Sequence, residues 1–493
     1  MSVINLETIF PIAKVERDII LSHQADVTVA FEAQLPELFS LSDQDYEAFH
    51  QVWIKAIKVL PASSIFHKQD WFVTDQYKAS YAAEDLSFLS RASERHFDER
   101  PFLNHKCYIM LSRRSSARKS VTSATSSLLR KSIVPQEALD PQKNQDFLDS
   151  VSQFERILSD SGFIQLNRIK SDAIASTTSK AGLLERYCYL TNEQQPLIKD
   201  IQFKEDWKIG ADYVQLYSLA DVEHLPSLCG SRINYDKYST DKSKYPVGFA
   251  SAIGQLLRCN HLYNQFIFID DPQKTMKQLE AKSLRLHSLS SYSRENAISR
   301  DATNEFLNEA ISAQRMPVKA HFNVMLWTEN KNELKELKTL VSAGLAQMDA
   351  IAKQETTGAP QIYWAGLPGN EPDFPENETF DTFAEQASCL LNLESNYRSV
   401  NSDFRMRVID RFGNPVWVDF SDWSMRQGIT TNRNKAVFGG SGSGKSMLMN
   451  HMQRAYYENG AHCLIVDVGN SYSGLCQLVN GYYFTYQEKN PIR

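Results

Sequence analysis

Cysteines are few in this sequence, and none has the spacing of a metal or redox site. The seven are Cys107, Cys188, Cys229, Cys259, Cys389, Cys463 and Cys476. There is no C-x-x-C pair, and no histidine pair lies close by at zinc spacing. This pattern excludes a disulfide framework or a structural zinc module and predicts buried thiols in a reducing compartment.

Long apolar runs are also missing, which excludes membrane-spanning helices. No stretch approaches the roughly 18 consecutive apolar residues that a spanning helix needs. The first 14 residues have no basic start and carry Glu7 and Pro11 within their apolar part, so we do not expect them to form a secretory signal. The net charge of −6 argues against bulk electrostatic binding to DNA, although local basic patches remain compatible with it.

The sequence does contain material for more than one buried core. Its 493 residues include 26 Phe, 21 Tyr and 7 Trp, which a disordered chain would not carry. Apolar and polar residues alternate over 26–31, as in a half-buried strand, and Ser42 to Asp45 resembles a capping box that opens a helix through Leu60. Further short strands and long helices predict an α/β or α+β architecture. The strands are expected at 107–111, 163–166, 266–269 and 321–327, and the helices from 272 and over 334–348.

Changes of composition divide the chain into three expected regions, 1–135, 136–400 and 401–493. The connector 112–134 is rich in Ser, Thr, Arg and Lys and contains no acid. We interpret it as a solvated connector, since no aromatic is interleaved; a basic patch for nucleic acid or acidic lipid is the alternative. A Gly- and Pro-rich loop at 366–375 is expected between the large region and the C-terminal region, and a hairpin is expected over 405–420.

One motif carries chemistry. Gly439-Gly440-Ser441-Gly442-Ser443-Gly444-Lys445-Ser446 fits G-x-x-x-x-G-K-[ST], the P-loop. We expect a buried strand at 435–438 before it and a helix after it, with Leu448, Met452, Ala455 and Tyr456 on one face. Glycines let the backbone approach phosphate oxygens, so the N–H groups of Gly440 to Lys445 should form an anion nest. Lys445, the candidate catalytic residue, should reach the β- and γ-phosphates of ATP, and Ser446 should bind Mg²⁺.

Asp467 ends a second expected strand, 463–467, and has two open interpretations. It could contact the water shell of Mg²⁺ or a neighbouring subunit's nucleotide, or it could cap the turn that starts at Ser471. A further short helix over 471–479 and a strand over 482–484 are expected. Only 48 residues follow Lys445, and none forms an apolar strand ending in Asp-Glu. We therefore expect an incomplete nucleotide domain without a Walker B acid and with slow or no hydrolysis.

Taken together, the hairpin 404–416 and the loop Gly439 to Ser446 resemble the TraG-type ATPases of conjugative transposons, relatives of the TraC-like motors of type IV secretion. The resemblance extends to Leu367-Pro368-Gly369-Asn370, to 35–42 and to 67–72. It implies a large N-terminal α+β region followed by the first part of a RecA-like P-loop ATPase domain. It also implies an ATP- and Mg²⁺-binding protein that forms a hexamer in the cytoplasm, docks on secretion components at the inner membrane and energises assembly or DNA–protein export.

Two other functions stay open at this point. One is a DNA translocase of the same superfamily; the net charge and the lack of a basic run in 401–493 argue against it, and direct DNA contact is undecided. The other is a non-catalytic interaction protein in which the N-terminal region binds partners.

Overall fold

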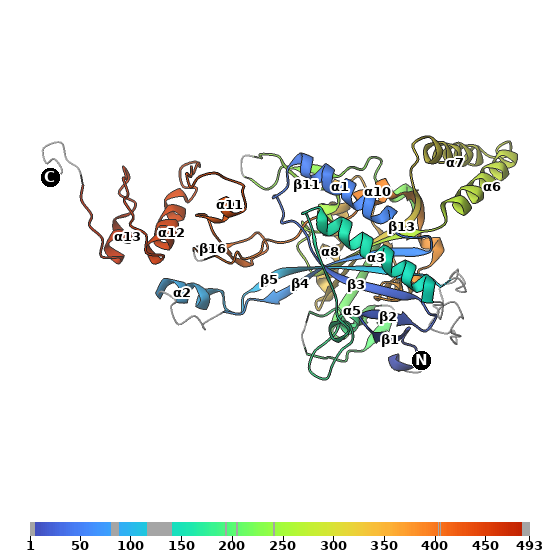
Figure 1. The fold of residues 1–493 in the computed structure, drawn as a ribbon, viewed down its shortest axis with the longest axis horizontal. Helices are drawn as coiled ribbons and strands as arrows, with labels where there is room; N and C mark the ends of the chain where they lie inside the picture. The colour runs from blue at the N-terminus through green and yellow to red at the C-terminus, as the bar shows by residue number, and fades with distance from the viewer. Residues whose placement is uncertain are drawn as a thin grey trace. The chain divides into compact units, whose positions relative to one another are not determined.

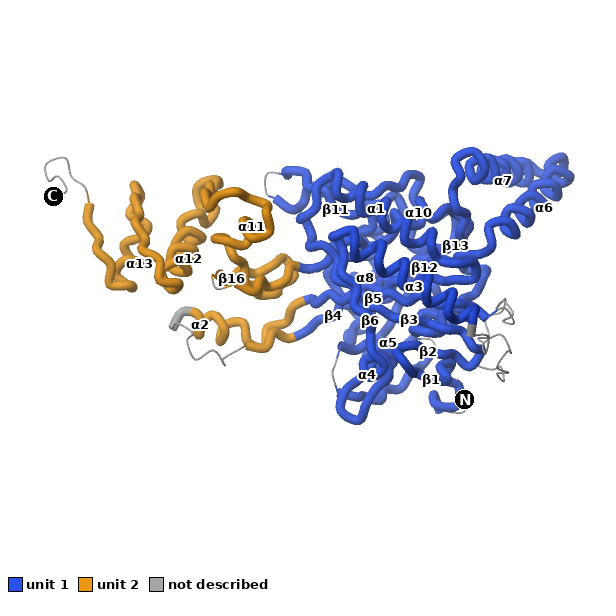
Figure 2. The backbone as a smooth tube through the Cα atoms, viewed as in Figure 1, with its two compact units in different colours: residues 1–75, 103–396 blue, residues 76–102, 397–493 orange. Residues whose placement is uncertain are grey.

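The computed structural model describes residues 5–79, 88–115, 141–192, 195–203, 206–239, 242–402, 404 and 406–485. Most of the expected connector, 116–134, lies outside these residues. Figure 2 shows two compact units, one of residues 1–75 and 103–396 (unit 1) and one of residues 76–102 and 397–493 (unit 2). The expected boundaries near 135 and 400 stay predictions.

Unit 1 is built on a large sheet whose strands pair antiparallel (Figure 1). Its path runs β1-β2-β3-β5-β4-β12-β13-β9-β8-β7, with β6 on β3, β14 on β9 and β15 on β13. The sheet strands are β1 (Ile12–Glu16), β2 (Ile19–Ser22), β3 (Val27–Gln34), β4 (Ser64–Gln76), β5 (Pro101–Arg113), β6 (Gln165–Arg168), β7 (Ile201–Phe203), β8 (Trp207–Ile209), β9 (Asp212–Leu219), β12 (His261–Ile269), β13 (Pro317–Thr328), β14 (Lys353–Glu355) and β15 (Phe380–Phe383). The expected mixture of strands and helices is confirmed, in its α+β form.

Helices cover both faces of this sheet, because strand side chains alternate between the faces. Tyr263 belongs to the core beneath α1, α3, α8 and α10, whereas its neighbour Leu262 belongs to the core beneath α5 and α9. A separate two-stranded ribbon, β10–β11, and the paired helices α6 and α7 complete the unit. The remaining elements of unit 1 are α1 (Asp43–Lys58), α3 (Pro141–Asp160), α4 (Ser171–Ile174), α5 (Leu183–Tyr189), β10 (Arg232–Tyr235), β11 (Tyr245–Gly248), α6 (Pro272–Leu289), α7 (Arg294–Ser312), α8 (Leu334–Gln347), α9 (Ala359–Ala365) and α10 (Ala384–Cys389).

The Gly- and Pro-rich segment 366–375 is a buried turn of unit 1, and the chain stays in this unit through Asn396. Glu371 is fully buried and accepts hydrogen bonds from the Ser112 hydroxyl at 2.7 Å and the Gly369 N–H at 3.0 Å. Turn-forming residues therefore mark a tight change of direction inside the core here, not an exposed connection between units.

Unit 2 contains the tip of the β4–β5 ribbon with α2 (Phe88–Phe97), followed by the C-terminal segment. Its elements are β16 (Met406–Ile409), β17 (Pro415–Val418), α11 (Trp423–Arg426), α12 (Lys445–Glu458) and α13 (Ser473–Leu478). The predicted hairpin is confirmed: β16 and β17 pair antiparallel, with Gly413 at a φ of +85° in the turn.

Candidate nucleotide-binding site

The P-loop motif forms a glycine-rich turn that leads directly into α12. Gly442 and Gly444 adopt φ angles of +77° and +90°, a region that L side chains rarely enter. A Cβ placed on either glycine would meet no atom within 4 Å, so backbone conformation and not space requires glycine here. Gly444 occupies the N-cap position of α12, which places the free N–H groups of the helix start at the loop.

The Lys445 side chain folds back over this loop. Its ammonium group donates hydrogen bonds to the carbonyl oxygens of Gly439 at 2.7 Å and Gly440 at 2.6 Å. The Ser443 hydroxyl also donates to the Gly440 carbonyl, at 2.9 Å. The ammonium therefore lies beside the backbone that would surround a phosphate, and phosphate oxygens could replace the two carbonyl acceptors.

Ser446 and Asp467 are the two predicted metal contacts. They differ in whether their side-chain oxygens are already used in hydrogen bonds. Ser446 is exposed in the first turn of α12, so its hydroxyl can face a ligand at the loop. Both Asp467 carboxylate oxygens accept backbone N–H groups, from Gly469 at 3.0 Å and Ser471 at 2.5 Å. These bonds match the turn-capping interpretation of Asp467, and its metal role stays a prediction. Among the described residues, no group of three or more His, Cys, Asp or Glu could hold a metal ion.

The turn that contains Asp467 is tied to the P-loop helix through one side chain. The Asn450 amide donates to the Ser446 carbonyl at 2.8 Å and to the Ser471 carbonyl at 3.2 Å. Asn450 was not among the predicted site residues, although its place one helical turn after Ser446 could have suggested it.

The three strands expected around the motif, 435–438, 463–467 and 482–484, are wrong for this structure. The described residues there form no strand, and side chains predicted to be buried are exposed, with Phe438 at 92%, Leu464 at 95% and Val466 at 92%. A buried parallel strand needs hydrogen-bonding neighbours and covered faces, and no other described segment supplies them here. The expected short helix is present as α13.

The apolar face predicted for α12 is confirmed in its packing. Met452 and Ala455 are buried against Phe404 and Met406 of the hairpin segment, with Leu448 and Tyr456 packed around them. The Phe404 and Tyr456 rings lie 4.7 Å apart. The β16–β17 hairpin thus supports the helix whose first turn carries Lys445 and Ser446.

A buried arginine, which sequence reasoning missed, holds this hairpin to α2. Arg407 of β16 is ion-paired with Glu94 of α2, and both side chains are about 3% exposed or less. The guanidinium also donates to the Tyr77 hydroxyl at 2.7 Å and lies 3.9 Å from the Trp417 ring centre. The His451 imidazole of α12 donates to the Arg407 carbonyl at 2.9 Å. Arg407 therefore connects the P-loop helix to the tip of the β4–β5 ribbon, within unit 2.

Comparison with protein families finds one match at each end of the chain. Residues 405–493 match the TraG P-loop domain. Residues 1–51 match the family described as "Domain of unknown function, B. Theta Gene description (DUF3875)". No curated protein matches the chain.

Proposed function

We propose that this chain, whose residues 405–493 match the TraG P-loop domain, is an ATPase of the conjugative-transfer type and binds ATP with Mg²⁺ at Gly439–Ser446. The observation that carries the proposal is the turn with Gly442 and Gly444 at positive φ, opening into α12 with the Lys445 ammonium folded over it. A helix N-terminus preceded by such a turn presents N–H groups and a positive dipole end to an anion.

Each residue then has a distinct role in the proposal. The backbone N–H groups from Gly440 to Lys445 hold the phosphates, and Lys445 neutralises the β- and γ-phosphate charge. The Ser446 hydroxyl binds Mg²⁺ directly. Asp467 contacts the metal through a water molecule at most, because both its oxygens already accept backbone N–H groups.

The biological setting that we propose is the type IV secretion machinery of conjugation. There the chain would use ATP to energise assembly or DNA–protein export, acting as a homo-oligomer, a hexamer as in its family. The support is the TraG domain itself. The helices of the described residues include none that is long and apolar enough to cross a membrane. We propose a cytoplasmic location, peripheral to the inner membrane, through contact with secretion components. The RecA-like fold of the ATPase domain belongs to the same proposal.

The test is the affinity for Mg-ATP, measured by isothermal titration calorimetry on the full chain and on Lys445→Ala. Removing the charged contact should weaken binding by about ten- to a hundredfold. Lys435→Ala is the matched control, because this lysine of the same segment donates to the Arg433 carbonyl at 2.9 Å and lies outside the motif. Equal affinity in the wild type and Lys445→Ala would disprove the proposed site.

A second candidate is nucleotide binding without turnover, as in a non-catalytic interaction protein. It is favoured by the engagement of Asp467, since hydrolysis by a P-loop enzyme needs an acid that orders Mg²⁺ and the attacking water. A steady-state phosphate-release assay beside Lys445→Ala separates the two. Turnover that disappears in Lys445→Ala would establish a hydrolytic motor, whereas ATP binding without turnover would establish the second candidate.

A further inference from the structure

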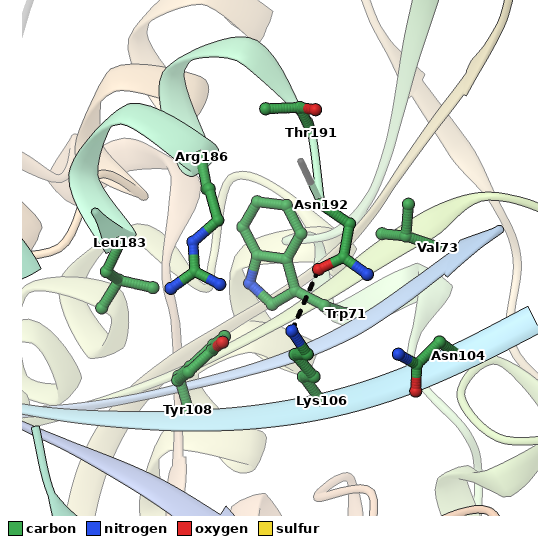
Figure 3. A pocket seen from close by; sticks show the side chains of 9 residues that line it. All are labelled: Trp71, Val73, Asn104, Lys106, Tyr108, Leu183, Arg186, Thr191 and Asn192. Carbon is green, nitrogen blue, oxygen red and sulfur yellow. Dashed lines mark hydrogen bonds between the residues drawn. The ribbon is translucent and has the colours of Figure 1, made fainter. Parts of the chain in front are cut away.

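Unit 1 contains a pocket at the junction of the β4–β5 ribbon and α5, apart from the P-loop (Figure 3). Its floor is formed by alternate residues of β5, with Lys106 and Tyr108 beside Trp71 of β4. Its wall is formed by Leu183 and Arg186 of α5 and by Asn192 after that helix. The enclosed part of the pocket is small, about 10 Å³, so a bound group would lie mostly at its open mouth, beside the charged side chains.

Two cationic side chains, Lys106 and Arg186, share this pocket. Lys106 donates one hydrogen bond, to the Asn192 side-chain oxygen at 3.2 Å, and the Arg186 Nε donates to the Gly182 carbonyl at 3.4 Å. In the described part of the chain, no acid lies within ion-pair distance of either cation. In Figure 3 both charged ends point toward the space in front of the Trp71 ring.

The surroundings make the two charges costly to keep together. Burial lowers the pKa of Lys106, and the charge of Arg186 lowers it further, while the charges of Glu32 and Asp75 act in the opposite direction. Asp75 is also engaged by amides, since it accepts from Asn104 at 3.2 Å and from Asn192 at 3.5 Å. A bound anion would compensate both cations.

We propose that this pocket binds a phosphate group through Lys106 and Arg186. A guanidinium presents two parallel N–H donors to a tetrahedral oxyanion, and an ammonium adds a point charge on a third oxygen. Asn192 positions Lys106 through its side-chain oxygen and leaves its amide for Asp75. The phosphate group belongs either to a free phosphate or to a phospholipid headgroup, and the site is separate from Gly439–Ser446.

The experiment uses the full chain with Lys445→Ala as the parent, so that phosphate contacts at the P-loop are reduced. Binding of inorganic phosphate and pyrophosphate is measured by calorimetry at low ionic strength. Lys106→Met and Arg186→Met should each weaken binding at this pocket at least tenfold, and the double variant should leave only the phosphate that the P-loop backbone still binds. Lys282→Met, an exposed lysine of α6 in the same unit, is the matched control and should leave binding unchanged.

A second readout separates binding from a structural role. Methionine keeps most of the length of Lys106 and removes a desolvated charge that Arg186 repels. The Lys106→Met variant should therefore melt at the parent temperature or higher while it loses phosphate binding. A lower melting temperature together with full phosphate binding would assign Lys106 a structural role and overturn the proposal. So would a parent that binds neither phosphate nor pyrophosphate.

Vesicles identify the source of the phosphate group. The parent and the double variant are sedimented with phosphatidylglycerol vesicles and with phosphatidylcholine vesicles. Loss of phosphatidylglycerol binding in the double variant, beside loss of phosphate binding, assigns a lipid headgroup. Loss of phosphate binding alone assigns a free phosphate. Unchanged binding of every probe in the double variant would overturn the proposal.

Discussion

Glu394 is a carboxylic acid in the core of unit 1, where its protonation is coupled to folding. It is fully buried and accepts hydrogen bonds from the hydroxyls of Tyr46 and Ser251 and from the Gly248 N–H. Burial raises its pKa to about 7, and the three donors oppose that rise. The folded pKa lies above the unfolded value, so the stabilisation is full below about pH 4.5 and is lost as the pH rises through 7.

Glu394→Gln should therefore flatten the dependence of stability on pH. The free energy of unfolding, measured with urea at pH 5.5 and pH 8, should fall less in the variant, by an amount on the order of 2 kcal/mol. Glu280→Gln, at an exposed position of α6, is the control and should follow the wild type. An unchanged fall with pH in Glu394→Gln would show that this carboxyl does not titrate in that range.

The backbone requirement of the P-loop can be tested by comparing Gly444 with a glycine outside the motif that has no positive φ. Gly444→Ala should destabilise the start of α12 by about 1 kcal/mol or more and weaken Mg-ATP binding, since its φ is +90°. Gly474→Ala is the control: this glycine of α13 lies outside the motif, has no positive φ, and its added Cβ would meet no atom within 4 Å. Calorimetric affinity and melting temperature measure both effects. Equal losses in the two variants would show that the positive φ of Gly444 has no special role.

At the residue scale, the sequence predicts which residues carry chemistry better than it predicts which charged side chains are buried. The P-loop can be recognised in the sequence because its glycines and its lysine occur at a fixed spacing. Lys68 and Asp70 are fully buried in β4, and Asp70 also accepts from His105 at 2.9 Å and from Asn392 at 3.0 Å. Burial alone would raise the pKa of Asp70, but Lys68 and His105 hold it below its usual range. The sequence around Asp70 does not predict His105 and Asn392 as its partners, because both lie in distant segments of the chain.

At the element scale, the ion pair of Arg407 and Glu94 fastens α2 to the β16–β17 hairpin. Arg407→Met would remove the cation from this buried pair, and the Tyr77 hydroxyl, which donates to Glu94 at 3.1 Å, cannot replace its charge. Removing one member of comparable buried pairs costs about 3–5 kcal/mol. We expect faster hydrogen exchange in α2 and β16 and a lower melting temperature for unit 2. The double variant Arg407→Met/Glu94→Gln should recover part of the loss. Arg426→Met, an exposed arginine of α11, is the control; if it has the same effect, the ion pair has no special role.

Elements were predictable where the local signal and the tertiary surroundings agree. The Ser42 hydroxyl accepts the Asp45 N–H, and the Asp45 carboxylate accepts the Ser42 N–H at 2.9 Å, so the expected capping box opens α1. The run 463–467 has a strong strand pattern, yet its side chains are exposed because the described residues supply no neighbouring strand. Periodicity predicts what a segment can bury, and its partners decide whether it does so.

At the scale of the whole molecule, unit 1 closes through a contact between its first strands and its last segment. The Ser395 N–H donates to the Pro36 carbonyl at 2.8 Å, and the Leu38 N–H donates to the Ser395 carbonyl at 3.0 Å. A fragment of residues 1–399 carrying Glu94→Gln should therefore be soluble and should unfold cooperatively. A fragment of residues 1–383 loses α10 and the closing segment and should show no cooperative transition. Calorimetry decides; precipitation of the longer fragment would contradict the proposed independence of unit 1.

The order of the strands in the sheet also determines when each strand can find its pairing partner during synthesis on the ribosome. β4 pairs with β12, so Trp71 can pair with Leu262 only after roughly 190 further residues have been synthesised. At about 5–20 residues per second, an open strand edge persists on the nascent chain for roughly ten to forty seconds. Closure at Ser395 comes later still, but before the P-loop is synthesised. The nascent chain thus passes through a long interval in which it is prone to aggregate, and its early strands are where a chaperone would act. The nucleotide site is translated only after all strands of unit 1 have been synthesised.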